Sequence, residues 1–327
     1  MEQTQQPFRG RIAVIGAGAL GIFYGAKLFR VGFDVHFYVR TGYEIVRDNG
    51  YRIRSCDGDF EIHPPVYDNP AKIGVCDLVL VGLKSFANEH LAWLLGPLCT
   101  ARTIVLTLQN GLGNEEAIAA ALTATGVCPD VATARQQIIG GTAFLCSNRV
   151  ATNEIHHTAH GFVRLAEFSG PPRARTHAVA AMFCASGIDC QVRESLSGIR
   201  WEKLVWNIPF NGLGVAAHHA DTAAILGDDE LRHVAVALMQ EVVAAARADN
   251  VEIDPSLAAD LLAKTESMGA YRSSMQIDYE EGRQLEVEAI LGEPVRRARR
   301  AGIAVPKMEM LYAIVRRMDA QRRRHLS

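Results

Sequence analysis

The stretch Arg11-Ile-Ala-Val-Ile-Gly-Ala-Gly-Ala-Leu-Gly21 decides the fold of the first half of the chain. Its four apolar residues predict a buried strand, and the glycines that follow lead into a helical segment. Gly16 would form the tight bend, Gly18 would let backbone N–H groups approach a diphosphate, and Gly21 would let the helix pack on the strand. The diphosphate would bind at the positive end of the helix. The pattern therefore predicts a dinucleotide site formed by Gly16, Ala17, Gly18, Ala19, Leu20 and Gly21.

The end of the next expected strand, Asp34–Val39, indicates which dinucleotide binds. Sites for NAD usually carry an acidic residue there, about 20 residues beyond the glycines, which accepts the ribose 2′-hydroxyl. This chain has Arg40 instead, and a guanidinium suits a 2′-phosphate. The alternative is that Arg40 is only a solvated residue leaving the strand. We expect NADP(H) as the cofactor.

Strands and helices continue to alternate along the first half. We expect a hairpin from Tyr51–Arg54 and Phe60–His63, and further strands at Cys76–Gly82, Thr103–Leu108, Gly140–Phe144 and Gly161–Leu165. Repeated strand–helix units predict an α/β domain with a doubly wound parallel sheet, whose ligands bind beyond the carboxyl ends of the strands. Lys84 and Asn110 come just after two such strands. We therefore expect both at the edge where the glycines lie.

The pattern changes after Gly170-Pro171-Pro172. Apolar residues then recur at helical spacing through Arg173–Ala185, Ser195–Leu213, Asp229–Asp249, Pro255–Lys264, Arg283–Ala301 and Pro306–Ala320. This half is predicted to be an all-helical domain. We expect the boundary within residues 169–195 and place it at 180, with a nucleotide-binding domain over 1–180 and a helical substrate and catalytic domain over 181–327.

Composition restricts the class of protein. The chain has 327 residues, of which 49% are hydrophobic and 21% charged, and its net charge is −2. These values are typical of soluble globular proteins and predict neither nucleic acid nor a membrane surface as partner. No apolar run reaches the roughly 18 residues of a membrane span, and the polar N-terminus lacks the order of a signal peptide. Seven cysteines without a CxxC pair predict no disulfide framework and no metal site, so we expect a cytoplasmic protein.

One helical segment of the second half carries an unusual polar stripe. Lys203, Asn207 and Asn211 are spaced i, i+4 and i+8, so a helix would place them on one face, although Pro209 could kink it. A lysine and two amides are costly on a core face. The alternative is an ordinary solvated face.

Several motifs in order resemble those of one enzyme family. They are Gly16-Ala-Gly-Ala-Leu-Gly21, Leu83-Lys84, Gln109-Asn-Gly-Leu-Gly113, Trp201-Glu-Lys-Leu204 with Asn207 and Asn211, the Ser-Ser-Met-Gln-x-Asp of residues 273–278, Gly282-Arg-x-x-Glu286, and Arg299–Pro306. Together they resemble the ketopantoate reductases (2-dehydropantoate 2-reductases). The resemblance spans nearly the whole chain. It implies a Rossmann-type domain followed by a helical domain, an active site in the cleft between them, and reduction of a 2-oxo acid by NADPH in pantothenate biosynthesis.

The resemblance also implies roles for individual residues. Lys203 would be the catalytic acid toward the ketone oxygen, and Glu286 would order the substrate and the lysine. Asn110 would contact both cofactor and substrate, Lys84 would lie beside the cofactor, and Arg40 would meet the 2′-phosphate. The substrate's hydroxyl and carboxylate would be held by Asn207, Asn211 and Ser274.

Two positions depart from the family pattern at the substrate end. Tyr271 stands where an asparagine is usual, and Asp221 stands where an amide is expected. The substrate could therefore be another 2-oxo acid or another small ketone. A second hypothesis is a non-catalytic NADP(H) sensor, and a third is a dehydrogenase of 3-hydroxy acids or opines. The apolar helical half is compatible with a homodimer.

Overall fold

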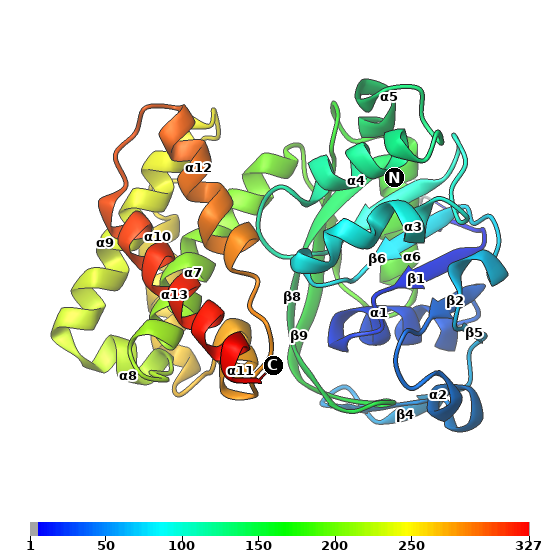
Figure 1. Ribbon diagram of the computed structural model, residues 1–327, viewed down its shortest axis with the longest axis horizontal. Helices are drawn as coiled ribbons and strands as arrows, with labels where there is room; N and C mark the ends of the chain where they lie inside the picture. The colour runs from blue at the N-terminus through cyan, green and yellow to red at the C-terminus, as the bar shows by residue number, and fades with distance from the viewer. Residues whose placement is uncertain (1–5, 327) are drawn as a thin grey trace, which may run out of the picture. The chain divides into compact units, whose positions relative to one another are not determined.

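The computed structural model describes residues 6–326 and divides into two compact units (Figure 1). Unit 1 contains the chain up to Gln109 together with Asn114–Leu196, and unit 2 contains Asn110–Gly113 and the chain from Ser197.

The centre of unit 1 is a parallel sheet. Four short strands are buried along their whole length and lie in the order β7, β6, β1, β2: β1 (Ile12–Ile15), β2 (Val35–Tyr38), β6 (Leu78–Val81) and β7 (Ile104–Thr107). The short strand β5 (Val66–Tyr67) extends it beyond β2. Strands that are covered on both faces become continuous apolar runs, which is why the sequence identified them.

The rest of the sheet is mixed. A long antiparallel hairpin, β8 (Ile138–Ala151) and β9 (Glu154–Glu167), continues from β7. Strand β9 then pairs in parallel with β3 (Tyr51–Ser55) and with β10 (Cys190–Val192), and β3 forms the expected hairpin with β4 (Phe60–Ile62). The expected α/β architecture is confirmed, but the doubly wound parallel pattern covers only the central strands. The expected strands 140–144 and 161–165 are the inner parts of the longer β8 and β9.

Helices cover both faces of this sheet (Figure 1). Alternate residues of β1 enter two different cores: Ile12 and Val14 join one core, and Ala13 and Ile15 join the other. The first core includes α1 (Ala19–Arg30) and α6 (Ala174–Ala185), and the second includes α3 (Leu91–Leu95), α4 (Asn114–Ala124) and α5 (Val131–Arg135). Helix α2 (Tyr43–Asn49) follows β2.

The first unit extends further than expected. The helix α6 packs on the sheet through Val179 and Phe183, and β10 adds a strand to it, so the units divide after Leu196 rather than at residue 180. The glycine–proline stretch before α6 marks a turn within unit 1.

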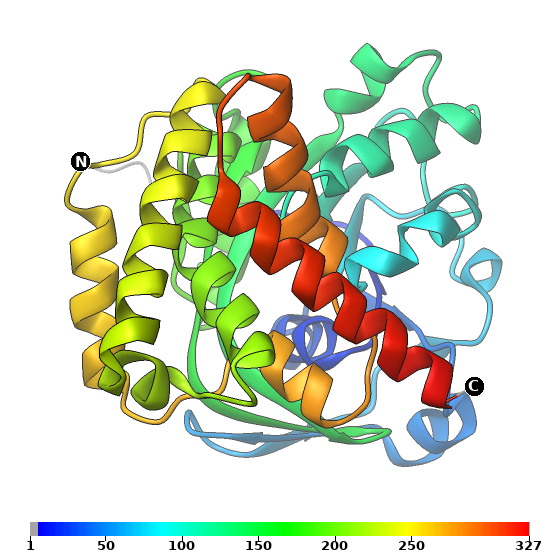
Figure 2. The ribbon, with the colours of Figure 1, turned by 60° about the vertical axis from the view of Figure 1, so that its left-hand side comes forward.

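Unit 2 is helical, as Figure 2 shows, and its core includes Trp201, Val205 and Leu238. Its helices are α7 (Leu196–Ala216), α8 (Thr222–Gly227), α9 (Asp229–Ala248), α10 (Leu257–Met268), α11 (Ser274–Glu280), a π-helical turn (Glu288–Gly292), α12 (Glu293–Arg300) and α13 (Pro306–Leu326). No helix within residues 6–326 has the length and apolar character needed to cross a membrane.

Candidate active site

Packing within unit 1 requires glycine at two positions of the glycine turn. Gly16 has a φ of +96°, and a Cβ there would lie 2.4 Å from the backbone nitrogen of Leu83. A Cβ at Gly21 would lie 2.2 Å from the carbonyl oxygen of Gly16, so helix α1 can pack closely only without one. Gly18 is different, because among residues 6–326 no atom beyond its own chain neighbourhood lies within 4 Å of a Cβ built on it. Protein packing does not require glycine there, whereas a ligand approaching the backbone would.

Charged groups follow the carboxyl ends of the neighbouring strands. Strands β2 and β6 run parallel to β1 on either side, so their carboxyl ends share the edge of the glycine turn. Arg40 is exposed two residues beyond β2, and Lys84 precedes the short helix Ser85–His90 that follows β6. An anionic nucleotide fits this edge, since it combines a helix N-terminus with two cations.

The amide of Asn110 joins the lysine and the glutamate of unit 2. Lys203 Nζ donates to Asn110 Oδ1 at 2.8 Å, and Asn110 Nδ2 donates to Glu286 Oε2 at 3.4 Å. Asn110 belongs to the segment Asn110–Gly113, which packs with unit 2 and is fixed by Leu112 N donating to Ala289 O. Three residues that are far apart in the sequence therefore form one polar array within a single unit.

The environment of Lys203 changes its acidity. Burial lowers the pKa of the Lys203 ammonium to about 7, the nearby Arg200 guanidinium lowers it further in the same direction, and the Glu286 carboxylate opposes both. An ammonium with a pKa near 7 gives up a proton far more readily than a free lysine. The array can therefore act as a proton donor near neutral pH.

Helix α7 continues through Pro209, so Lys203, Asn207 and Asn211 do share one face. Both asparagines are buried, with exposed fractions of 7% and 1%. Asn211 Oδ1 accepts from the backbone nitrogen of Met275 at 3.1 Å, which ties α7 to the start of α11. The alternative that this stripe is a solvated helix face is therefore wrong for the two asparagines.

The two serines before α11 have different surroundings. Ser273 is buried and its hydroxyl caps α11 by accepting from Gln276 N. Ser274 is the first residue of α11 and is exposed. Ser274 can therefore turn its hydroxyl to a ligand, whereas Ser273 has a structural role.

Glu286 does not lie on a helix, although the sequence predicted one over Arg283–Ala301. It lies in an irregular segment before the π-helical turn and is 5% exposed. Arg283 Nε donates to Asp278 Oδ1 at 2.8 Å, and Leu285 N donates to Asp319 Oδ1 of α13 at 3.1 Å. Sequence reasoning missed Asp319, because its contact with Leu285 joins two segments that are far apart in the chain.

Asp221 and Tyr271, the two departures from the family pattern, both make contacts within unit 2. Asp221 caps helix α8, because its Oδ1 accepts from Ala224 N at 2.8 Å. The backbone carbonyl of Tyr271 accepts from Thr222 N, and its ring lies 6.1 Å from that of Trp206. An aspartate at position 221 is thus explained by helix capping without any contact to substrate.

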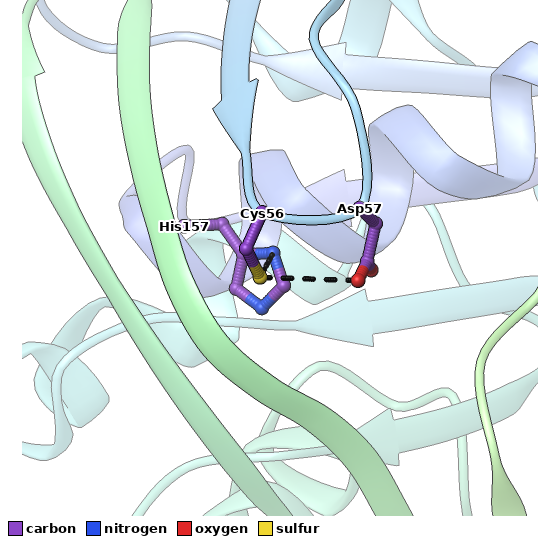
Figure 3. Close-up of side chains that lie close together, drawn as sticks. All are labelled: Cys56, Asp57 and His157. Atoms are coloured by element: carbon purple, nitrogen blue, oxygen red, sulfur yellow. Dashed lines mark hydrogen bonds between the residues drawn. The ribbon is translucent and has the colours of Figure 1, made fainter.

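A second polar cluster in unit 1, drawn in Figure 3, brings together Cys56, Asp57 and His157. His157 Nε2 donates to the carbonyl of His160 at 2.8 Å, and Ser55 Oγ lies 2.9 Å from Nδ1. The ammonium of Lys27 binds the Asp57 carboxylate at 3.1 Å. A metal ion bound here would have to displace Ser55 from His157 and Lys27 from Asp57. The contacts instead connect the β3–β4 turn to β9.

Comparison with known proteins identifies the family. The model for Ketopantoate reductase PanE/ApbA matches residues 12–170, and the one for its C terminal matches residues 195–319. The 2-dehydropantoate 2-reductase of Nostoc sp. is 41% identical over 320 residues, covering 96% of both chains. The chain belongs to the ketopantoate reductase family. It is therefore an oxidoreductase of the nicotinamide-dependent kind.

Solved structures agree with this membership. The 2-dehydropantoate 2-reductase of Geobacter metallireducens is 45% identical with a TM-score of 0.88, covering 94% of this chain and 99% of that one. A ternary structure of D-mandelate dehydrogenase with NADH and anilino(oxo)acetate has a TM-score of 0.84 at 20% identity, covering 96% and 99%. The first is a ketopantoate reductase relative, and the second shows the shared fold.

Proposed function

We propose that this ketopantoate reductase family member reduces 2-dehydropantoate to pantoate with NADPH, using Lys203 as the acid. The observation that supports this most is the array of Lys203, Asn110 and Glu286, in which a lysine with a pKa of about 7 donates to an amide held by a carboxylate. The names of the Nostoc and Geobacter relatives supply the substrate.

The proposed chemistry needs one proton and one hydride. The bound cofactor supplies the hydride to the ketone carbon. Negative charge then builds on the ketone oxygen, where the Lys203 ammonium stabilises it and transfers a proton to give the alcohol. The lysine is left as a neutral amine and recovers its proton from solvent. A pKa near 7 suits both steps at neutral pH.

Asn110 and Glu286 are proposed to orient the acid. The Asn110 oxygen accepts one Lys203 proton, which leaves the other N–H groups of the ammonium for the ketone. Glu286 fixes the amide so that its oxygen faces the lysine. We further propose that Asn207, Asn211 and Ser274 hold the substrate's hydroxyl and carboxylate. The Nδ2 of Asn211 is the atom for this, since its Oδ1 accepts from Met275.

NADP(H) is proposed rather than NAD(H) because of Arg40. No acidic residue stands at the end of β2, and the exposed guanidinium two residues later can form a forked contact with a 2′-phosphate. The glycine turn would receive the diphosphate, and Lys84 and Asn110 are the remaining proposed cofactor ligands.

A related function is reduction of another 2-oxo acid. Tyr271 favours it, because the tyrosine lies three residues before Ser274, where the family pattern has asparagine. The decisive assay compares turnover across a panel of 2-oxo acids with NADPH and with NADH. The proposal requires the largest kcat/KM for 2-dehydropantoate with NADPH. A larger value for another 2-oxo acid would reassign the substrate, and tight NADPH binding without turnover would indicate a sensor.

We also propose a homodimer formed through α13. Met310 and Ile314 lie one turn apart on this helix and are 58% and 42% exposed. A second copy packed on this face of the helix would remove both apolar side chains from water.

A further inference from the structure

The turn of the β8–β9 hairpin is anchored close to the segment that follows β2. A Cβ at Gly42 would lie 2.0 Å from Thr152 Cγ2, so these residues are in direct contact. Asn153 Nδ2 donates to Gly50 O at 3.1 Å, and its carbonyl accepts from Arg52 N at 2.8 Å. In Figure 1 the hairpin turn lies near α2 and β4. Its position in unit 1 is therefore fixed from several sides.

A bulge in β8 directs Arg149 to the glycine turn. The register of the hairpin shifts between Arg149 and Ala151, which leaves Val150 as the extra residue. Bulges commonly re-aim a side chain next to a functional site. Arg149 Nη1 donates to the carbonyl of Ala17 at 3.1 Å, and its Nε donates to Ala151 O at 3.3 Å. The guanidinium thus lies against the turn between Gly16 and Gly18.

The charge of Arg149 has no carboxylate partner among residues 6–326. A guanidinium has five N–H donors, and the two contacts to carbonyl oxygens use only two of them. Neighbouring arginines on the β3–β4 hairpin differ, because Arg52 pairs with Glu61 and Arg54 pairs with Asp59. Two carbonyl contacts need a donor but not a full positive charge.

We propose that Arg149 binds the diphosphate of the nicotinamide dinucleotide. This inference rests on the proposed function and extends its cofactor site by a residue from a distant part of the chain. The glycine turn and the α1 N-terminus offer backbone N–H groups to a diphosphate, and Arg149 adds a forked cation beside them. Arg149 would serve the group that NADPH and NADH share, whereas Arg40 would serve the 2′-phosphate that only NADPH carries.

The test measures cofactor affinity directly in Arg149→Gln and Arg149→Lys. Both replacements can donate to the Ala17 carbonyl, but only lysine keeps the charge. The dissociation constant for NADPH is measured by its fluorescence, and that for NADH by competition with NADPH. Arg149→Gln should weaken both cofactors by a similar factor of roughly tenfold or more, and Arg149→Lys should retain most of the affinity. Arg40→Gln should weaken NADPH alone.

Arg52→Gln is the matched control, because it removes an exposed arginine of the same region that faces Glu61. It should leave both affinities unchanged. Wild-type affinity for Arg149→Gln would overturn the inference, as would equal losses in the glutamine and lysine variants or a loss for NADPH alone. Failure of the wild-type protein to bind NADPH would instead overturn the proposed function.

Discussion

A lysine becomes a proton donor at neutral pH only through its surroundings, and in this protein the surroundings of Lys203 come from three parts of the chain. Burial and Arg200 lower the pKa of Lys203, Glu286 raises it, and the hydrogen bond to Asn110 fixes the direction of the ammonium. The sequence places Lys203 on a polar stripe, but it does not show how deeply that stripe is buried. Burial is a tertiary property, and it determines the acidity.

Replacing Lys203 with alanine should lower kcat by about 100-fold or more, because the ketone oxygen loses both its proton donor and its stabilising charge. Affinity for NADPH, measured by fluorescence, should stay near the wild-type value. Alanine at Glu202, which precedes Lys203 on the same helix, is the control for disturbing α7. Wild-type turnover in Lys203→Ala would remove the lysine from the mechanism.

The reduction rate should fall as pH rises through about 7, because the proposed mechanism needs the ammonium form of Lys203. Glu286 raises the pKa of that ammonium, so Glu286→Gln should move the midpoint of the profile to lower pH. The measurement is kcat against pH for the wild type and the variant. Glu288→Gln is the control. Glu288 lies two residues from Glu286, and its exposed side chain pairs with Arg296, so this variant should leave the midpoint unchanged. A shift to higher pH in Glu286→Gln would contradict the assignment.

At the scale of elements, two short segments without regular helix bring Asn110 and Glu286 to α7. The first is Asn110–Gly113, in which Gly111 has a φ of +81° and a Cβ would lie 2.3 Å from the carbonyl of Ala289. The second precedes the π-helical turn and is held at Leu285 by Asp319. The geometry of the site depends on these two segments.

The variant Gly111→Ala should lower both the free energy of unfolding and kcat, because it adds a clash to an unfavourable backbone conformation. Gly113→Ala is its matched control. Gly113 has a φ of +89°, but the nearest atom to a Cβ there is 3.7 Å away, so this variant should cost only about 1 kcal/mol from the conformation itself. Denaturant titration of both variants measures the difference. Equal losses would show that Gly111 does not need its close approach to Ala289.

Asp319 should act on catalysis through the backbone of Leu285. Asp319→Leu removes the acceptor and should lower kcat by roughly tenfold, with little change in affinity for NADPH. Asp319→Asn keeps an oxygen acceptor and should restore most of the rate. Arg323→Ala removes only the cation 3.1 Å from the other carboxylate oxygen and serves as the control. Loss of stability without this rescue in kcat would indicate a purely structural residue.

Regular elements could be read from the sequence, and these irregular segments could not. Strand β1, the β3–β4 hairpin and helix α7 follow from periodicity and glycine placement, because burial imposes those patterns locally. Glu286 was expected on a helix, since the apolar spacing of 283–301 matches one. Asp319 and Arg149 matter through contacts with distant residues, which no local pattern records.

Over the whole chain, the order of the motifs is more specific to the family than any single motif. Each motif alone is weak, and the glycine turn occurs in many unrelated proteins. The matches to both parts of the ketopantoate reductase family establish membership.

The proposed homodimer predicts that the molar mass in solution, measured by light scattering, is about twice that of one chain. Met310→Glu should shift it toward the monomer, because a carboxylate would enter the apolar face of α13. Met268→Glu is the control, since Met268 ends a different helix and is 38% exposed. A monomeric wild type would exclude this assembly.

The assignment of Asn110–Gly113 to the second unit has a consequence for recombination between relatives. A chimera joined at residue 196 would combine Lys203 and Glu286 from one parent with Asn110 from the other. Such a hybrid inherits the proposed proton donor and the amide that accepts from it from different parents. An active chimera that exchanges the helical half should therefore also exchange Asn110–Gly113.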